Sequence, residues 1–505
     1  MKKRDLLYKS SDISSVDEAA FLHELKSIVT TNNVTGYIVG GAVRDMLLGY
    51  VPQDIDMAVS ISAPDMAQRM IDIIGGTAVS LGGEDGVVRV VVDDRWSSNG
   101  DFQKYCDITT IRGDIESDLG QRDFTIDAMA ISIDKDWGMG WGDCLTSDII
   151  DPFGGKSDLS NRLIRAVADD IFESDPCRLL RAVRLAAEYD FTVENHTEDL
   201  IRIQGRMLEK VAGERIREEL CRLLNVPRAT EYLRCLDLLC LFNVIFPELI
   251  ICKGVDQPKE HFWDVFDHSM ETVFAVEGLL QMDQSIYGRS LPIDGSLSTV
   301  LQNIRGRVGD TNRIVLLKLA ALLHDVAKPQ TKNIEKDGRT HFFGHAKEGA
   351  LMARDVLKRL RFGGQQIRLV ESMIEHHLRL WQMSNIGLPT RRAIYRYFRD
   401  TTDASFDIIV LSLADYIASQ GPNLDVEEWN RHCELMGYIA TEYQKGDDIV
   451  SPPKLVNGHD LIKTFDLEPG PDIGRILEAI REAQAAGEIN TKEQALVFAK
   501  EQLKA

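Results

Sequence analysis

The chain lacks long apolar runs, clustered cysteines and low-complexity tracts. None of its apolar stretches approaches the roughly 20 residues that cross a bilayer, and polar residues rather than an apolar secretory core follow the basic start at residues 1–4. Its eight cysteines are scattered without a Cys-x-x-Cys pair, which predicts reduced thiols. These absences argue against a secreted or membrane-spanning protein and predict a cytoplasmic location.

An excess of positive charge is also missing. The 505 residues carry a net charge of −21 and no basic tail, so the overall field does not attract nucleic acid. Arginines concentrate between residues 162 and 222, but acidic residues are interleaved with them. This pattern fits a local basic groove and a set of salt-bridged helices equally well, and charge alone leaves both open.

What the sequence does contain is a glycine turn followed by two carboxylates. Gly40-Gly41 follows a short apolar strand and begins a helix that carries Arg44, and Asp54 and Asp56 lie in the next predicted strand. A glycine turn lets backbone N–H groups approach a phosphate at the helix start. Side chains alternate along a strand, so the two carboxylates share one face and could hold two divalent cations for an in-line phosphoryl displacement. The combination predicts nucleotidyl transfer from a nucleoside triphosphate.

Three later positions fit the same chemistry. Asp107 lies within the predicted strand 105–110, where a charge is costly unless it is paired or bound to metal, so it is a candidate third carboxylate. The alternative is a carboxylate on the exposed face of that strand. Arg122 could neutralise triphosphate oxygens and Asp123 could accept a hydrogen bond from a ribose hydroxyl, with Arg112 grouped beside them. In isolation, Arg122 and Asp123 would be only a charged turn before a buried strand or helix.

A further pair is suited to reading a base. Asp175 and Arg178 are three residues apart, so they lie on neighbouring parts of one helix face. A carboxylate acceptor beside a guanidinium donor can pair with the Watson–Crick edge of a base. The structural alternative is helix capping, because Pro176 suits a first helical position and makes Ser174 or Asp175 an N-cap.

In this order and spacing, the segments resemble the bacterial, class II branch of the tRNA nucleotidyltransferase and poly(A) polymerase family. The matching stretches are Gly40–Asp56, Arg122–Ala130, Asp151–Arg165, Asp175–Ala186 and Glu214–Leu220. The resemblance implies an α+β fold with a polymerase-β-like head, a mixed sheet with helices, followed by an all-α neck, body and tail that hold tRNA. It also implies Mg²⁺ at Asp54 and Asp56, CTP and ATP as substrates, the tRNA 3′ end as partner, and base pairing by Asp175 and Arg178.

The chain departs from the family pattern in several places. Gln121, Asp127 and Ser174 stand where Arg, Asn and Glu are usual. The segment between Arg112 and Arg122 is shorter than the flexible loop of many CCA-adding members, and this resembles members that add only CC. The hypothesis is therefore that terminal A addition is weakened or absent.

Histidines and carboxylates form a second pattern. His324-Asp325 interrupts an otherwise apolar helix, where buried polar neighbours need partners and a metal would supply one. The other candidate ligands are His268, His345, His376 of the pair His376-His377, and Asp415. This set resembles an HD-domain phosphohydrolase and implies a divalent metal with phosphatase or 2′,3′-cyclic phosphodiesterase activity. The alternative is a helical scaffold without metal; His341 could support the site from behind.

The predicted organisation is a head at 1–150, a neck at 151–230, a body with the HD domain at 231–420 and a tail at 421–505. The stretch near 283–311 is expected to be an insertion or a loose loop. Two other functions share these motifs: a poly(A) polymerase, and an HD metal phosphohydrolase whose head only binds RNA.

Overall fold

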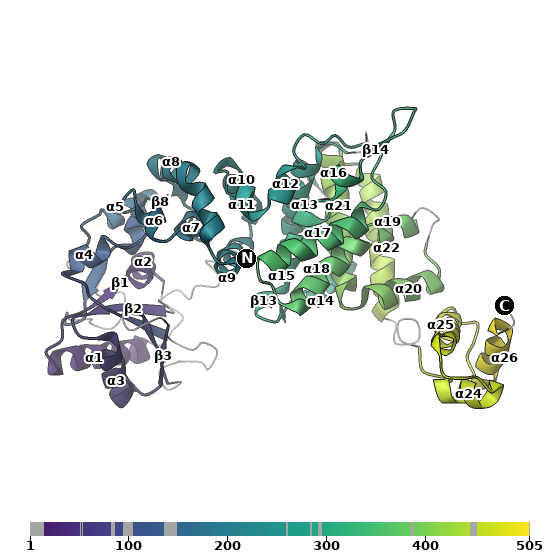
Figure 1. Cartoon of the computed structure of the whole chain (residues 1–505), viewed down its shortest axis with the longest axis horizontal. Coiled ribbons are helices and arrows are strands. Elements are labelled where there is room, and N and C mark those ends of the chain that lie inside the picture. Colours follow the sequence, from purple (N-terminus) through teal and green to yellow (C-terminus); the bar gives the residue numbers. More distant parts are fainter. Residues whose placement is uncertain are drawn as a thin grey trace. The chain divides into compact units, whose positions relative to one another are not determined.

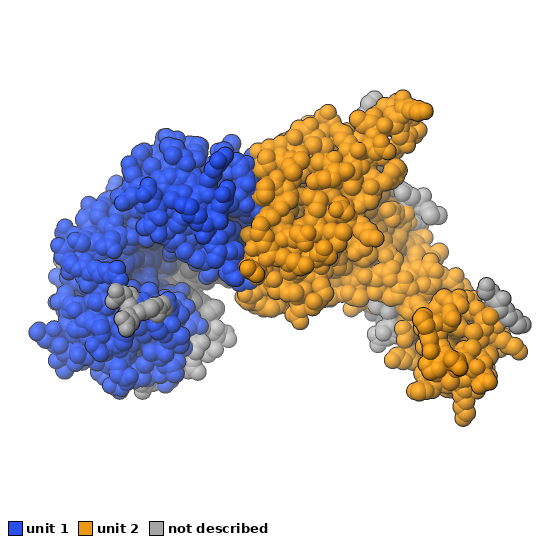
Figure 2. Space-filling view, viewed as in Figure 1, with its two compact units in different colours: residues 1–245 blue, residues 246–505 orange. Residues whose placement is uncertain are grey.

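The structure is a computed structural model in which the chain forms two compact units, 1–245 and 246–505 (Figures 1 and 2). Each unit is described by itself. The described residues are 15–50, 52, 54–81, 86–93, 105–135, 149–258, 261–282, 285–290, 295–384, 388–444 and 452–503.

The first unit begins with a seven-stranded sheet in the order β3-β4-β5-β2-β1-β6-β7. The strands are β1 Gly36–Val39, β2 Asp54–Val59, β3 Thr77–Ser80, β4 Val88–Val91, β5 Tyr105–Thr110, β6 Ala130–Ser132 and β7 Ile149–Ile150. Only β2 and β5 pair in parallel, and the other neighbours are antiparallel. The sheet is therefore mixed, and the predicted α+β class is confirmed.

Three helices complete the core of this sheet: α1 (Ser15–Thr31), α2 (Gly41–Leu47) and α3 (Ala63–Ile74). The helix α3 begins where the Ser62 hydroxyl accepts a hydrogen bond from the Asp65 N–H. Its Met66, Met70 and Ile74 are spaced four apart and fully buried, so one face of the helix closes the core.

The rest of the first unit is mainly helical. Its helices are α4 Ile115–Leu119, α5 Gly155–Asn161, α6 Ile171–Ser174, α7 Arg178–Tyr189, α8 Asn195–Gln204, α9 Gly213–Leu224, α10 Ala229–Leu238 and α11 Phe242–Ile245, with the short parallel strands β8 Leu163–Ile164 and β9 Thr192–Val193. Helix α7 packs on α9, and the buried Arg184 of α7 pairs with Glu219 of α9 at 2.7 Å and with Glu188 of its own helix at 2.6 Å.

The second unit is a helical bundle with three small hairpins. Its helices are α12 Pro247–Ile250, α13 Val265–Leu280, α14 Gly295–Asn303, α15 Arg313–Leu323, α16 Lys328–Thr331, α17 His345–Arg359, α18 Gly364–His376, α19 Arg379–Ser384, α20 Arg391–Thr401, α21 Ser405–Gln420, α22 Val426–Gln444, α24 Gly458–Phe465, α25 Pro471–Ala485 and α26 Lys492–Gln502. The hairpins are β10–β11 (Ser285–Ile286, Arg289–Ser290), β12–β13 (Arg307–Val308, Thr311–Asn312) and β14–β15 (Asn333–Ile334, Thr340–His341). Helices α13, α15 and α21 are apolar on almost every side because they form the centre of the bundle.

The last three helices have a small core of their own, which includes Leu461, Ile476 and Ile480. Helix α25 also packs on α20, where Arg396 pairs with Glu482 at 2.6 Å.

Two expectations from the sequence change here. The described part of 283–311 holds a hairpin and α14, so the expected loose loop is wrong there, and the strands β8 and β9 lie in a region expected to be helical only. The four domain boundaries stay predictions. Among the described helices, none has both the length and the apolar character that crossing a membrane requires.

Candidate catalytic centre and metal cluster

Three carboxylates lie on one face of the head sheet. Asp54 and Asp56 are two apart on β2, and Asp56 is in register with Asp107 on the parallel strand β5. Burial raises the pKa of Asp54. Burial also raises the pKa of Asp56, to about 6; the negative charge of Asp107 adds to this rise, and the positive charge of Arg122 opposes it. Carboxylates crowded in this way disfavour ionisation unless a cation neutralises them, so the residues fit a divalent metal.

The glycine turn is fitted closely against this site. Gly40 has φ 69°, and a Cβ there would lie 2.5 Å from Nη1 of Arg122 and 3.1 Å from Oδ2 of Asp56. Only glycine therefore fits, for its backbone angle and for space. The Gly40 N–H donates to the Met129 carbonyl at 3.1 Å, so this amide is already used within the protein.

Arg44 is buried behind the turn. Its guanidinium pairs with Asp127 at 2.5 Å and Asp45 at 2.9 Å and lies 4.5 Å from the ring centroid of Tyr189. The Tyr189 hydroxyl donates to Asp45 at 2.8 Å, which ties α2 of the head to α7. These contacts hold the Arg44 guanidinium beneath Gly41, and a role for Arg44 in nucleotide binding stays a prediction.

The other candidate residues of the head are Asp107, Asp123, Arg122 and Arg112, and the first three lie beside residues of opposite charge. Both oxygens of Asp107 accept hydrogen bonds from Arg89 at 2.7 Å, so its negative charge is balanced within the sheet. Asp123 is buried and pairs with Arg181 of α7 at 3.1 Å. Arg122 lies 3.6 Å from Asp118 and beside Asp56. Arg112 is exposed directly after β5.

Asp175 and Arg178 bond to different residues rather than to each other. Asp175 forms a double ion pair with Arg215 of α9 at 2.7 and 2.9 Å and accepts a hydrogen bond from the Cys177 N–H at 3.1 Å. Arg178 donates to the Ser174 hydroxyl at 3.1 Å and to the Gln121 carbonyl at 2.9 Å. The Asp175 carboxylate thus holds the turn that precedes α7, whose N-cap position is Cys177. Arg215 is a partner that the sequence did not indicate.

In the second unit, the helices α13, α17, α18 and α21 and the segment that follows α15 bring a cluster of histidines and carboxylates together. Nε2 of His268 lies 3.2 Å from Nε2 of His324 and 3.0 Å from Asp415, and Asp325 lies 3.1 Å from His324 and 3.3 Å from His345. The three overlapping groups of ligand atoms each lie within 4.8 Å of one another. They include His268, His324, Asp325, His345, His377 and Asp415.

Backbone carbonyls orient the rings of this cluster. Nδ1 of His324, His345 and His377 each lies 2.7–2.8 Å from the carbonyl three residues earlier, as in the 2.8 Å contact with Ala321. If Nδ1–H donates in these bonds, the lone pair of each Nε2 is directed to the centre. Such carbonyl partners are the usual way in which metal-binding imidazoles are held.

The electrostatics of the cluster suit a cation. Burial lowers the pKa of His377 to about 3; for His324 burial also acts to lower the pKa, but the carboxylates of Asp325 and Asp415 raise it to about 10. A positive charge is therefore favoured at the centre. Nε2 of His345 and Oδ1 of Asp325 are buried without a hydrogen bond among the described residues, which a divalent metal would remedy.

One ligand choice is corrected. His376 was expected from the sequence, but Nε2 of its neighbour His377 lies in the cluster, while His376 is half-buried and outside it. The two residues are 100° apart on the helix, and the sequence cannot choose between them. His341 pairs with Glu335 at 3.2 Å rather than with the cluster.

Four family models match successive parts of the chain. They are the poly A polymerase head domain at residues 36–165, a probable RNA and SrmB-binding site of polymerase A at 190–252, the HD domain at 265–420 and a putative tRNA nucleotidyltransferase domain 2 at 351–499. An A-adding tRNA nucleotidyltransferase of Deinococcus radiodurans is 30% identical over 467 residues, which are 91% of this chain and 94% of that protein. The chain belongs to the tRNA nucleotidyltransferase family. It is an enzyme of the nucleotidyltransferase kind.

Two further proteins are similar over most of the chain. A CC-adding tRNA nucleotidyltransferase of Thermus thermophilus is 31% identical and covers 91% of this chain and 92% of its own length. A solved Thermotoga maritima CCA-adding enzyme with bound tRNA matches with a TM-score of 0.59 at 22% identity, over 96% of this chain and 95% of that one. The fold is therefore that of the family. The poly A polymerase head domain and the HD domain are both families of metal-dependent enzymes.

Two residues of this nucleotidyltransferase lie beside the HD cluster although the sequence did not predict them there. Lys328 is buried, and its Nζ lies 2.6 Å from Asp325 and 2.6 Å from Gln257. His261 lies 5.4 Å from His268 between ring centroids, and burial lowers its pKa to about 4. Lys328 follows Asp325 by three residues in an apolar segment, a spacing that could have indicated it.

Proposed function

We propose that this enzyme adds C, A or both from CTP and ATP to the 3′ end of tRNA without a nucleic-acid template. The observation that carries the proposal is the carboxylate pair Asp54 and Asp56, with the glycine turn at Gly40 beside it and the charge of Arg122 close enough to act on Asp56. We infer that Asp54 and Asp56 hold Mg²⁺, with Asp107 as a third carboxylate once Arg89 releases it. The bound metal would neutralise charge on the triphosphate and favour attack by the RNA hydroxyl.

The side chains around the metal ligands have separate tasks in this proposal. Arg122 and the exposed Arg112 attract triphosphate oxygens, and Asp123, held by Arg181, accepts from the ribose. Asp175 and Arg178 read the base, and Arg215 holds the Asp175 carboxylate in place. Asp123, Asp175 and Arg178 already have partners within the protein, so in this proposal a correctly placed nucleotide shares or exchanges these bonds.

We further propose that the enzyme adds the terminal A weakly or not at all. Strand β5 ends at Thr110 and α4 begins at Ile115, so only residues 111–114 connect them. The turn is tight, because Gly113 has φ 86° and the Asp114 carboxylate caps α4 by accepting from the Ser117 N–H at 2.8 Å. A long flexible loop has no place in this connection.

Two RNA substrates test this directly. A tRNA lacking its last three nucleotides is incubated with labelled CTP and then with ATP, and a tRNA that already ends in CC receives ATP alone. We expect CTP to be incorporated and ATP to be incorporated poorly. Efficient ATP incorporation after CC would refute the CC-only part while leaving nucleotide transfer intact.

A poly(A) polymerase is the second candidate, because the head matches the poly A polymerase head domain. An oligo(A) primer with ATP distinguishes it. Elongation of oligo(A) at the rate of tRNA would favour this candidate.

We also propose that the cluster of the HD domain holds a divalent metal through His268, His324, Asp325, His345, His377 and Asp415, and that it acts on phosphate esters, as a phosphatase or cyclic phosphodiesterase. Metal analysis of the wild type against the double variant His324→Ala, Asp325→Ala tests the site. Equal metal content in both proteins would contradict it.

The described cysteines are all free thiols, which supports the cytoplasmic location that we propose for this activity.

A further inference from the structure

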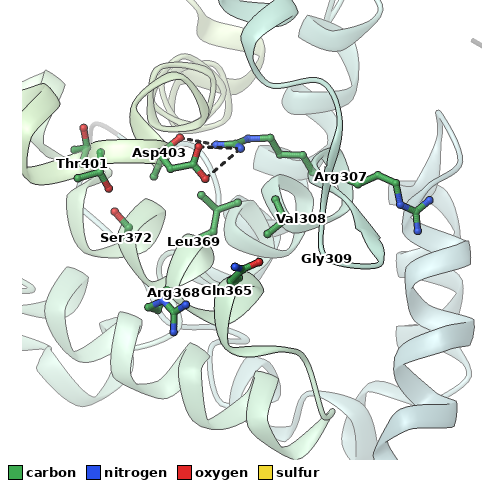
Figure 3. A pocket seen from close by; sticks show the side chains of 12 residues that line it. Arg307, Val308, Gly309, Gln365, Arg368, Leu369, Ser372, Thr401 and Asp403 are labelled. Atoms are coloured by element: carbon green, nitrogen blue, oxygen red, sulfur yellow. Dashed lines mark hydrogen bonds and ion pairs between the residues drawn. The ribbon is translucent and has the colours of Figure 1, made fainter. Parts of the chain in front are cut away.

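The second unit contains a cavity of about 550 Å³ that no step above uses (Figure 3). It lies between the β12–β13 hairpin, the first turns of α18, and the turn from α20 into α21. The metal cluster takes His324 and His377 from the opposite, carboxyl-terminal ends of α15 and α18. The cavity is therefore separate from the HD site.

Three donors line the cavity from one face of α18. Gln365, Arg368 and Ser372 are three and four residues apart, so they follow each other along the helix surface (Figure 3). Within the described part of the chain, none of these three side chains forms a hydrogen bond or an ion pair. An amide, a guanidinium and a hydroxyl are thus all available to one ligand.

The guanidinium of Arg368 lies at the start of its own helix and pairs with no carboxylate among the described residues. Nη1 of Arg368 lies 3.3 Å from the point where a Cβ on Gly364 would be, which places the guanidinium beside the first residue of its own helix. The start of a helix carries a partial positive charge, so a cation there is unfavourable without an anion nearby. Helix α15 begins at the same cavity.

The other arginines of the cavity are already engaged. Arg313 pairs with Asp403 at 3.2 Å, marked by dashed lines in Figure 3, and with the buried Asp407 at 2.7 Å. Arg307 donates to the Asp310 carbonyl. Of the three described arginines that line the cavity, Arg368 is the one whose guanidinium forms no hydrogen bond or ion pair.

We propose that this cavity binds a phosphate group through Arg368, Gln365 and Ser372. A phosphate offers acceptors alone, and a planar guanidinium matches two of its oxygens. The volume lies in the range of small-ligand sites. The phosphate could belong to an RNA backbone or to a free phosphorylated small molecule, and either assignment is independent of the chemistry of the head.

The first test measures hydrogen exchange of residues 364–372 in the full chain as inorganic phosphate is added. Phosphate should protect this segment in the wild type. Arg368→Glu should raise the half-saturating phosphate concentration about tenfold or more, because it removes a charge-assisted hydrogen bond. Arg339→Glu, an exposed arginine on the β14–β15 hairpin, is the matched control and should behave as wild type.

Arg368→Gln repeats the test without charge reversal, and circular dichroism checks that each variant is folded. No protection of the segment by phosphate, or equal protection in wild type and Arg368→Glu, would overturn the proposal.

The second test identifies the source of the phosphate from tRNA binding at increasing salt. If the RNA backbone supplies it, Arg368→Glu should reduce the slope of log K against log salt by about one, and Arg339→Glu should not. An unchanged slope together with weaker phosphate protection assigns the cavity to a free phosphorylated ligand.

Discussion

The carboxylate of Asp56 lies where β2 meets both β1 and β5, and burial beside Asp107 raises its pKa to about 6. The folded-state pKa is above the usual carboxyl value, so the metal-free protein holds a proton there as the pH falls below about 6. A metal must displace this proton. We therefore predict that the apparent Kd for Mg²⁺ at the head rises about tenfold for each pH unit below 6 and is constant above pH 7, as measured by calorimetric titration.

Asp65, on the solvent side of α3, provides the control for this titration. Asp65→Asn should leave the pH profile unchanged, whereas Asp56→Asn should remove tight binding at every pH. The same affinity at pH 5 and pH 7 in the wild type would contradict the assignment of Asp56.

Arg44 and Asp127 form the buried ion pair beneath the glycine turn. Arg44→Met should lower the free energy of unfolding by about 3–5 kcal/mol, because Asp127 would remain as an uncompensated buried charge. Asp127→Asn keeps an acceptor for Arg44 and should cost only about 1 kcal/mol. Urea denaturation measures both, and an Arg44→Met protein as stable as the wild type would show that the pair does not support the turn.

At the scale of elements, the metal cluster joins α13, α17, α18 and α21 to the segment that follows α15. A metal that binds only the folded state should stabilise this bundle by about 2.7 kcal/mol at a hundred times its Kd. We predict that His377→Ala loses bound metal and this thermal stabilisation, while the neighbouring His376→Ala keeps both. Elemental analysis and thermal unfolding with added Mn²⁺ check the pair of variants, and equal losses in the two would contradict the assignment.

The elements of the head were largely predictable from the sequence. Strand β5 has the predicted bounds, because β-branched residues and period-two alternation are local signals. The turn at Gly40 and the shared face of Asp54 and Asp56 follow from the same local rules.

Partners from distant parts of the chain were not predictable. Arg215 lies 40 residues beyond Asp175, and Arg89 reaches Asp107 only because β4 and β5 pair in that register. His377 replaces His376 because the rotation of α18 is set by packing rather than by its own sequence. One amino-acid sequence read by itself carries no signal for such contacts.

At the scale of the whole molecule, one unit carries the carboxylate pair and the other carries the metal cluster. The two sites are built from separate elements, so they should fail separately. We predict that the double variant His324→Ala, Asp325→Ala retains nucleotide incorporation within about twofold of the wild type, as a labelled-nucleotide assay would measure. A complete loss of incorporation in a folded double variant would show that the cluster takes part in transfer.

The most direct test of the account is the incorporation of labelled CTP, under Mg²⁺, into a tRNA that lacks its last three nucleotides. The wild type and Asp65→Asn should extend the RNA, and Asp54→Asn and Asp56→Asn should lose extension by several orders of magnitude while staying folded, because the triphosphate loses its metal. An intact wild type that extends no RNA, or an Asp56→Asn protein that extends it normally, would contradict the claim that these two carboxylates drive the transfer.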